Sequence, residues 1–136
     1  MDFSLITLAG TQYHENVSEV LLRTSEGDTV IMPHHEPLTA IVLGGPLTIR
    51  TKAKKEDIFA IYGGILEIED NKATLLADEA DHADSLVESE IAASMKLAQE
   101  LQNNAQTKIE LQRARQLVDR HAIRLDVARI RRRKNR

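Results

Sequence analysis

The sequence predicts an N-terminal antiparallel β-sandwich or barrel of eight or more short strands, followed by an antiparallel two-helix hairpin. Within residues 1–77, turn signals recur every eight to twelve residues and the apolar residues show no helical period. From position 65 onward the chain has no Gly or Pro, and from about residue 84 its composition shifts to the helix formers Ala, Glu, Gln, Leu and Arg. The two parts of the chain therefore belong to different structural classes.

Short apolar or alternating runs mark the predicted strands. Turn chemistry separates them at 26–28, 44–46, 63–64 and 70–71, where Gly, Pro, Asp and Asn gather. The runs are 3–8, 17–24, 30–32, 38–43, 47–51, 58–62, 65–69 and 73–77. We interpret Gly44-Gly45 and Gly63-Gly64 as turn or bulge glycines.

The helical part is expected to begin near Ser85, because Ser85-Leu86-Val87-Glu88 fits a capping box. Asn103-Asn104 is the expected break between the two helices, and residues 78–84 are the expected hinge. Each helix has an apolar stripe that recurs every three or four residues. The stripes are Val87, Ile91, Met95, Ala98, Leu101 and Ala105, then Ile109 or Glu110, Ala114, Leu117, Val118, His121, Ala122, Leu125 and Ala128. Because these stripes are Ala-rich, the hairpin should dock on the sandwich or on another protein.

Length and composition describe an ordinary soluble globular protein. The chain has 136 residues, 42% apolar and 29% charged, and no cysteine, which excludes thiolate catalysis and cysteine-held metal clusters. We expect no signal peptide, because Asp2 stands where a basic region belongs, and no run of 18 apolar residues is present to span a membrane.

The net charge of −3 combines unlike segments. Residues 1–80 carry six Lys or Arg and thirteen Asp or Glu, whereas residues 129–136 carry six basic residues and no acid. This basic end has three interpretations. It complements the dipole of the second helix, it binds nucleic acid, or it meets an acidic protein surface through Arg–carboxylate pairs. The acidic body and an aromatic content of 3% count against nucleic acid.

The residues that carry catalytic chemistry elsewhere do not form a catalytic pattern here. No phosphate-binding loop and no G-x-S-x-G nucleophile motif is present. His34 and His35 would point to opposite faces of a strand, and the acidic run 78–84 lacks the spacing of a calcium loop. We therefore predict a protein that is not an enzyme and holds no metal and no cofactor.

Three ordered motifs carry a family resemblance. Residues 25–38 read SEGDTVIMPHHEPL, residues 45–49 read GPLTI, and residues 63–78 read GGILEIEDNKATLLAD. Together with the helical hairpin that follows, they make the chain similar to the epsilon subunit of F-type ATP synthases. The double-Gly strand and the strand after it are the most specific part. The segment departs from the family pattern at Thr29-Val30, where relatives favour an apolar residue and Gly.

The resemblance implies a sandwich of about ten strands at 1–82 and a helical hairpin with a basic tail at 83–136. It implies a non-catalytic rotor subunit of the central stalk of a proton-translocating ATP synthase. The sandwich would bind the gamma subunit and the c-ring. The implied ring contacts are Gly27, Asp28, Met32, Pro33, His34, His35 and Glu36. The subunit would be peripheral to the membrane, on the cytoplasmic face of a bacterial inner membrane or the stromal face of a plastid thylakoid, without a nucleic-acid partner.

The resemblance also implies that the hairpin inhibits ATP hydrolysis by extending toward the beta and alpha subunits. The implied contacts are Arg115, Arg120, Arg124, Arg129, Arg131 and Arg132. ATP-sensing relatives carry [IL]-D-x-x-R-A at the start of the first helix, where this chain has Val87, Glu90 and Ile91 in place of the Asp, Arg and Ala. A Glu repels phosphate, so we expect no ATP binding. The alternatives are a nucleic-acid-binding module that uses the basic tail, and a regulatory sensor without rotor contacts.

Overall fold

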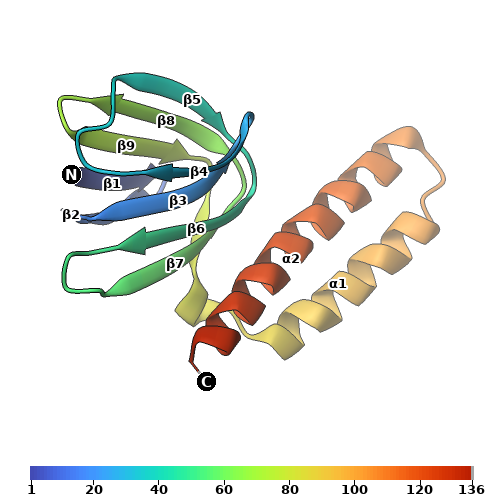
Figure 1. Ribbon diagram of the computed structural model, residues 1–136. Coiled ribbons are helices and arrows are strands. Elements are labelled where there is room, and N and C mark those ends of the chain that lie inside the picture. Colours follow the sequence, from blue (N-terminus) through green and yellow to red (C-terminus); the bar gives the residue numbers. More distant parts are fainter. Residues whose placement is uncertain (136) are drawn as a thin grey trace. The chain divides into compact units, whose positions relative to one another are not determined.

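The computed structural model describes residues 1–135. The chain forms two compact units, Met1–Ala83 and Asp84–Arg136 (Figure 1). The first unit is a ten-stranded, mostly antiparallel sheet that closes into a near-barrel sandwich. Its strands are β1 (Asp2–Thr7), β2 (Gly10–Asn16), β3 (Glu19–Thr24), β4 (Gly27–Ile31), β5 (Leu38–Val42), β6 (Gly45–Arg50), β7 (Glu56–Ile61), β8 (Gly64–Glu69), β9 (Lys72–Ala77) and β10 (Ala80–His82). The predicted fold class is confirmed.

The strand order explains how one sheet makes two layers. The order is β10-β7-β6-β3-β5-β8-β9-β1-β2, and β4 pairs with β3 beside this path. β3 joins the two halves because it pairs with β6 along its first residues and with β5 only at Thr24, opposite Val42. The pair β1 and β9 is parallel, and the other pairs are antiparallel.

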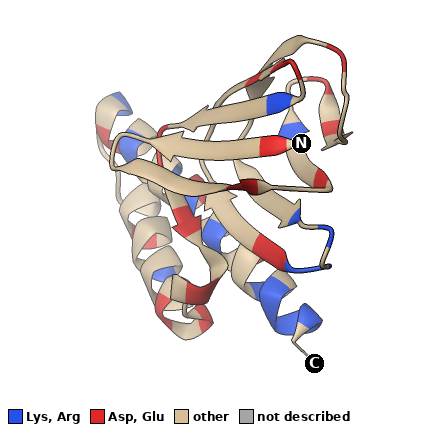
Figure 2. Cartoon of the chain, turned by 90° about the vertical axis from the view of Figure 1, so that its left-hand side faces the viewer, with Lys and Arg blue, Asp and Glu red and all other residues tan. Residues whose placement is uncertain are grey.

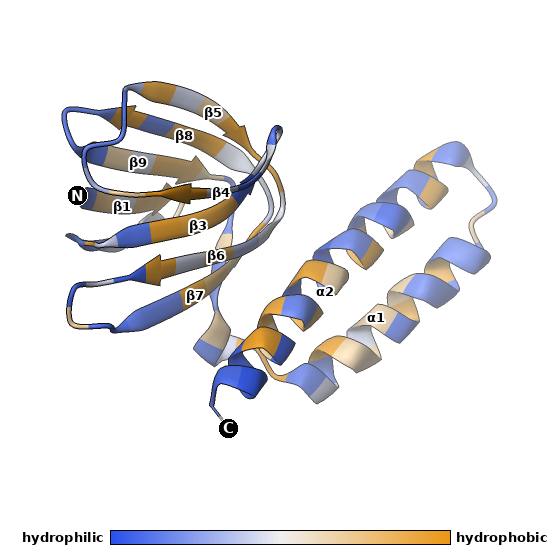
Figure 3. Cartoon of the chain, viewed as in Figure 1, coloured by the Kyte–Doolittle hydropathy of each residue, from blue (hydrophilic) through white to orange (hydrophobic). Residues whose placement is uncertain are grey.

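Alternate residues of the strands point inward and form one core. Phe3, Leu5, Leu47, Leu66 and Leu75 are completely buried there. A fully buried aliphatic or aromatic side chain contributes roughly 1.5–3 kcal/mol by leaving water. In Figure 3 the apolar segments follow the strands, whereas hydrophilic residues dominate the second helix.

Two strands and the hinge differ from the sequence prediction. β2 was not predicted, because its residues GTQYHEN are polar and almost all exposed and carry no apolar alternation. It forms as the antiparallel partner of β1, with Leu5 opposite Tyr13. β10, three residues long, pairs with β7 inside the segment 78–84 that was expected to be a hinge, and a 3₁₀ turn at Ala83–Ser85 follows it.

Gly63 lies in the β7–β8 connection, which confirms its interpretation as a turn residue, whereas Gly64 is the first residue of β8. Gly63 has φ +125°, a conformation that other residues rarely adopt. A Cβ on Gly64 would lie 2.3 Å from the carbonyl oxygen of Leu76, so β9 passes too close for any side chain at this point.

The second unit contains two helices, α1 (Glu88–Asn103) and α2 (Lys108–Lys134), which pack antiparallel. The break predicted at Asn103-Asn104 is confirmed. Helix α1 begins near Ser85 as predicted, but the predicted capping box is wrong, because Ser85 ends the 3₁₀ turn and the N-cap is Val87, whose side chain makes no cap hydrogen bond. A second sequence of the same type, Thr107-Lys108-Ile109-Glu110, does cap a helix, since the Glu110 amide donates to Thr107 Oγ1 at 3.1 Å.

Replacing Thr107 with alanine is expected to destabilise the first turn of α2 by about 1 kcal/mol, because the Glu110 amide loses its acceptor. Amide hydrogen exchange by NMR measures this as faster exchange of the amides that begin α2. Thr107→Ser keeps the hydroxyl and is the matched control. Equal exchange in the alanine and serine variants would show that the hydroxyl does not cap the helix.

Candidate interaction surfaces

The outward face of β5, β8, β9 and β1 carries a row of aliphatic side chains, one from each strand. Ile41 lies opposite Ile65, Ile65 opposite Leu76, and Leu76 opposite Ile6. Ile41 is 61% exposed, Ile65 51% and Leu76 49%. Neighbours in register on adjacent strands are about 5 Å apart, so the four side chains form one continuous stripe across the sheet. We call Ile6, Ile41, Ile65 and Leu76 the aliphatic row.

The rest of this face is polar and becomes acidic away from the row. Outward positions along the same strands are Thr39, Glu67 and Thr74, followed by Glu69 opposite Lys72. Glu67, Glu69, Asp70, Lys72 and Thr74 line a shallow hollow of about 230 Å³. The face therefore offers an apolar stripe and an acidic margin, a pattern that suits a partner with aliphatic and basic side chains.

No sequence motif marks the aliphatic row directly, although the strands contain an indirect sign of it. β5, β8 and β9 hold adjacent aliphatic residues, as in Ile41-Val42, Ile65-Leu66 and Leu75-Leu76. Neighbouring residues of a strand point to opposite faces, so such pairs indicate strands that are apolar on both sides. Only the strand register shows that the outward members line up.

The residues predicted to contact the c-ring lie in two places. Gly27 and Asp28 begin β4 next to the Ser25–Glu26 turn, whereas Met32, Pro33, His34, His35 and Glu36 follow the end of β4. At about 3.3 Å per residue, roughly 13 Å separates Asp28 from Met32. The structure therefore places the two groups at opposite ends of one short strand.

Side-chain and backbone contacts define each of these two ends. Asp28 Oδ1 accepts a hydrogen bond from Arg23 Nε at 3.1 Å. His34 has φ 65°, and its amide donates to Asn71 Oδ1 at 2.7 Å. A hydrogen bond of 2.7 Å joins His35 Nδ1 to the carbonyl of Glu36. The His34–Asn71 bond ties loop 32–37 to the β8–β9 turn, and the His35–Glu36 bond lies within the loop.

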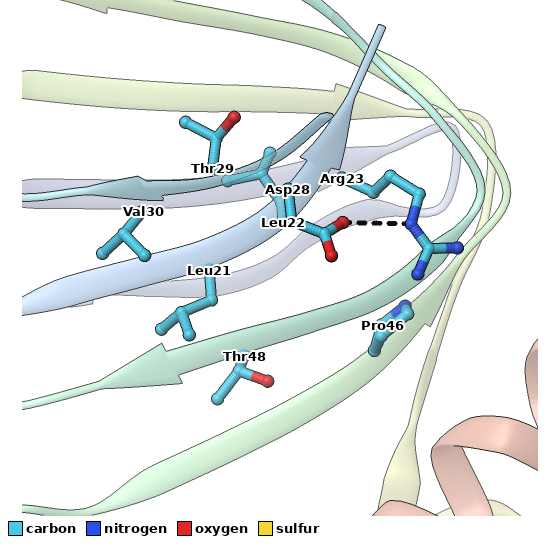
Figure 4. Close-up of a pocket in the computed structure, with 8 residues that line it drawn as sticks. All are labelled: Leu21, Leu22, Arg23, Asp28, Thr29, Val30, Pro46 and Thr48. Carbon is cyan, nitrogen blue, oxygen red and sulfur yellow. Dashed lines mark hydrogen bonds and ion pairs between the residues drawn. The ribbon is translucent and has the colours of Figure 1, made fainter. Parts of the chain in front are cut away.

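A groove of about 230 Å³ crosses the outer face of β4, β3 and β6. Figure 4 shows Leu21, Val30 and Thr48 along its length and the Arg23–Asp28 pair at one end. Val30 is 49% exposed. Asp28 could be predicted as a site residue from the family resemblance, whereas no sequence pattern marks the apolar residues of this groove.

Figure 2 shows Lys and Arg gathered at the C-terminal end of α2, and three of these arginines form ion pairs with carboxylates. Arg129 Nε lies 3.4 Å from Glu88 Oε1, Arg132 Nη1 lies 3.0 Å from Glu88 Oε2, and Arg131 Nε lies 2.7 Å from Asp84 Oδ1. Three of the six arginines predicted to contact the beta and alpha subunits are thus already paired within the helical unit. The antiparallel packing brings these arginines to Glu88 and Asp84, because it places the end of α2 beside the start of α1.

The other three arginines predicted to contact the beta and alpha subunits lie along the middle of α2. Arg115 is exposed, while Arg120 and Arg124 are partly buried. Between them, His121 has its Nδ1 buried without a hydrogen-bond partner among residues 1–135. Burial, and then the charges of Arg124 and Arg120, lower the pKa of His121 below its ordinary value. The imidazole is therefore neutral near pH 7 and does not add to the positive charge of the helix.

Within residues 1–135, no three His, Asp or Glu side chains gather as metal ligands would. Neither helix, over the same residues, is long and apolar enough to cross a membrane.

An exposed aliphatic row beside an acidic margin is a pattern typical of surfaces that bind other proteins. The sequence profile of the family described as "ATP synthase, Delta/Epsilon chain, beta-sandwich domain" matches residues 1–83, more than half of the chain. The chain belongs to the delta/epsilon chain family of ATP synthase. It is a structural subunit and not a catalytic one.

Individual relatives agree with this assignment. The ATP synthase epsilon chain of Campylobacter concisus is 34% identical over 101 residues, which cover 74% of this chain and 78% of the relative. That of Acinetobacter baylyi is 30% identical over 110 residues, covering 81% and 79%.

Two solved assemblies share the fold. A chain in the Euglena gracilis mitochondrial ATP synthase (OSCP/F1/c-ring) superimposes with a TM-score of 0.79 at 17% identity and covers 88% of this chain and 76% of its own length. A chain in the Tetrahymena thermophila mitochondrial ATP synthase (central stalk/c-ring) gives 0.63 at 19% identity and covers 94% and 96%. At these identities the likeness concerns the fold.

Proposed function

We propose that this chain is an epsilon-type rotor subunit of the central stalk of a proton-translocating ATP synthase and couples c-ring rotation to the catalytic head. The aliphatic row carries the proposal. A monomer gains nothing by exposing three large aliphatic side chains in register, whereas a permanent neighbour would remove them from water. Family membership and the c-ring assemblies of the two fold neighbours support the same role.

The gamma subunit is the proposed occupant of this face. A stalk subunit that turns with the rotor must hold its neighbour permanently, and permanent interfaces are more apolar at their centre than transient ones. The aliphatic row provides such a centre, and Glu67 and Glu69 provide a charged rim for basic side chains of the partner.

The c-ring is the second proposed partner of the sandwich. Gly27 and Asp28 at one end of β4 and residues 32–36 at the other are the proposed contacts. Because about 13 Å lies between them, a contact that uses both groups must run along β4 rather than meet a single loop tip. Asp28 already pairs with Arg23, so a basic ring loop would share this carboxylate or displace the arginine.

The helical unit is proposed to inhibit ATP hydrolysis by reaching the beta and alpha subunits in an extended state. Arg115, Arg120, Arg124, Arg129, Arg131 and Arg132 are the proposed contacts. Small side chains such as Ala98 and Ala114 occupy buried positions of both helices, so the packed hairpin buries little apolar area and an alternative arrangement costs little free energy. No nucleotide takes part in this proposal, because Glu90 stands where phosphate needs a cation.

We propose that the protein is peripheral to the membrane, on the cytoplasmic face of a bacterial inner membrane or the stromal face of a plastid thylakoid. A nucleic-acid-binding module is the competing function, and it would use the same basic tail. The acidic body of the chain and its aromatic content of 3% count against it.

Co-purification tests the proposed function against its competitor. An affinity-tagged copy expressed in the source organism should bring down the membrane ATPase, and low-salt stripping should release it in water-soluble form. The binding of DNA and RNA to the purified chain, titrated with salt, is the parallel measurement. Recovery of nucleic acid without any ATPase subunit would contradict the rotor assignment.

A further inference from the structure

The open end of the hairpin is closed by carboxylates and arginines that are far apart in the sequence. Glu88, the first residue of α1, accepts from Arg129 and Arg132, which lie 41 and 44 residues away. Arg132 Nη1 lies within 3.1 Å of both carboxylate oxygens of Glu88. Asp84 pairs with Arg131 at 2.7 Å.

The helix dipoles favour this arrangement. Glu88 lies at the N-terminus of α1, where a negative charge is stabilised, and the arginines lie in the last turns of α2, where positive charges are stabilised. Antiparallel packing places these two helix ends side by side. Each charge is therefore favoured at its own helix end and also finds its counter-ion across the hairpin.

The remainder of the hairpin does less to hold the helices together. Leu97 and Leu101 of α1 and Ile109 and Leu117 of α2 are 41–63% exposed. The buried residues of α1 are only Ile91 and Ala98. With so little apolar burial, a few charge pairs change the balance between packed and parted helices appreciably.

We propose that Asp84 and Glu88 form, with Arg129, Arg131 and Arg132, a charge clasp that keeps the hairpin closed and occupies the arginines that the extended state needs. An acidic partner surface competes with Glu88 and Asp84 for these arginines. When the hairpin opens and the partner binds, carboxylates of the partner therefore replace Glu88 and Asp84 as the counter-ions of the arginines. The charge clasp is a property of the chain by itself. Its effect on ATP hydrolysis rests on the proposed function.

Single-molecule fluorescence energy transfer on the full chain tests the clasp. The chain contains no cysteine, so Ser89→Cys and Asn135→Cys place two dyes uniquely at the start of α1 and the end of α2. Closed helices hold the dyes close together. Since α1 is about 24 Å long and α2 about 40 Å, parted helices separate them widely.

Glu88→Gln should raise the ratio of open to closed molecules about three- to tenfold at low salt, as expected for loss of partly exposed ion pairs. Glu90→Gln removes the same charge two residues further along α1, where no ion pair forms within residues 1–135, and should leave the ratio unchanged. Near 1 M salt, where charges are screened within about 3 Å, the wild-type ratio should approach that of Glu88→Gln.

A charge swap keeps the test decisive if Glu88→Gln unfolds the hairpin. Glu88→Arg combined with Arg132→Glu restores an opposite pair and should recover closure relative to Glu88→Arg alone. Equal ratios in Glu88→Gln and Glu90→Gln, or no recovery in the swap, would overturn the clasp. A clasp seen by fluorescence with unchanged ATP hydrolysis by the Glu88→Gln complex supports the clasp and contradicts the inhibitory role proposed above.

Discussion

Replacing Ile65 with aspartate is expected to weaken binding of the gamma subunit at least a hundredfold while leaving the sandwich folded. Ile65 lies between Ile41 and Leu76 in the aliphatic row and is 51% exposed. In the complex, the new carboxylate would be buried among aliphatic side chains and would lose its hydration without gaining a partner. In the unbound chain it would remain in water. Isothermal titration of the purified gamma subunit with each variant measures the effect.

Val30→Asp is the matched control for this binding experiment. Val30 is 49% exposed and also aliphatic, but it lies on β4 in the other layer of the sandwich, beside the groove of Figure 4. It should bind gamma as the wild type does. If Val30→Asp lost binding and Ile65→Asp kept it, gamma would occupy the groove face and the assignment of the aliphatic row would be wrong.

Leu66→Ala is expected to lower the free energy of unfolding of the sandwich by about 2–5 kcal/mol. Leu66 follows Ile65 on β8, points into the core and is completely buried, so truncation leaves a cavity. Both tyrosines, Tyr13 and Tyr62, lie in the sandwich and the chain has no tryptophan. Tyrosine fluorescence during urea denaturation therefore follows this unit alone.

Leu76→Ala is the control for the stability measurement. Leu76 is 49% exposed on the outward face, and surface substitutions usually change stability by less than about 0.5 kcal/mol. A similar loss in Leu76→Ala and Leu66→Ala would mean that the outward face is part of the core rather than a binding surface. Substitutions at two adjacent residues of one strand thus have different expected effects, since Ile65→Asp weakens gamma binding and Leu66→Ala lowers the free energy of unfolding.

The strands and helices that have a clear hydrophobic pattern could be predicted from the sequence. Eight strands with apolar runs, and two helices broken at Asn103-Asn104, follow from periodicity and turn residues. β2 has no such pattern, because an exposed strand of polar residues forms only through its pairing with β1. Capping boxes were ambiguous for a similar reason. Ser85 and Thr107 carry the same signature, but the 3₁₀ turn at 83–85 takes the first out of helical position.

The candidate surfaces likewise include residues that the sequence predicts and residues that only the tertiary structure brings together. The arginines of α2 follow from the charge pattern and the segments around Asp28 and His35 from the family resemblance, and both remain predictions. The aliphatic row depends on which residue lies opposite which across four strands, and this register is a tertiary property. The clasp likewise requires Glu88 to meet residues 41 and 44 positions away, which only the packed hairpin shows.

Photo-crosslinking in the assembled enzyme tests the central claim most directly. Glu67 points outward beside the aliphatic row, and Glu67→Cys, as the only cysteine, carries a benzophenone label at its rim. Irradiation of the ATP synthase that contains this variant should give one adduct, between this chain and the gamma subunit. A variant that assembles but crosslinks to another subunit, or a chain that never enters the complex, would contradict the proposal that this face binds the rotor.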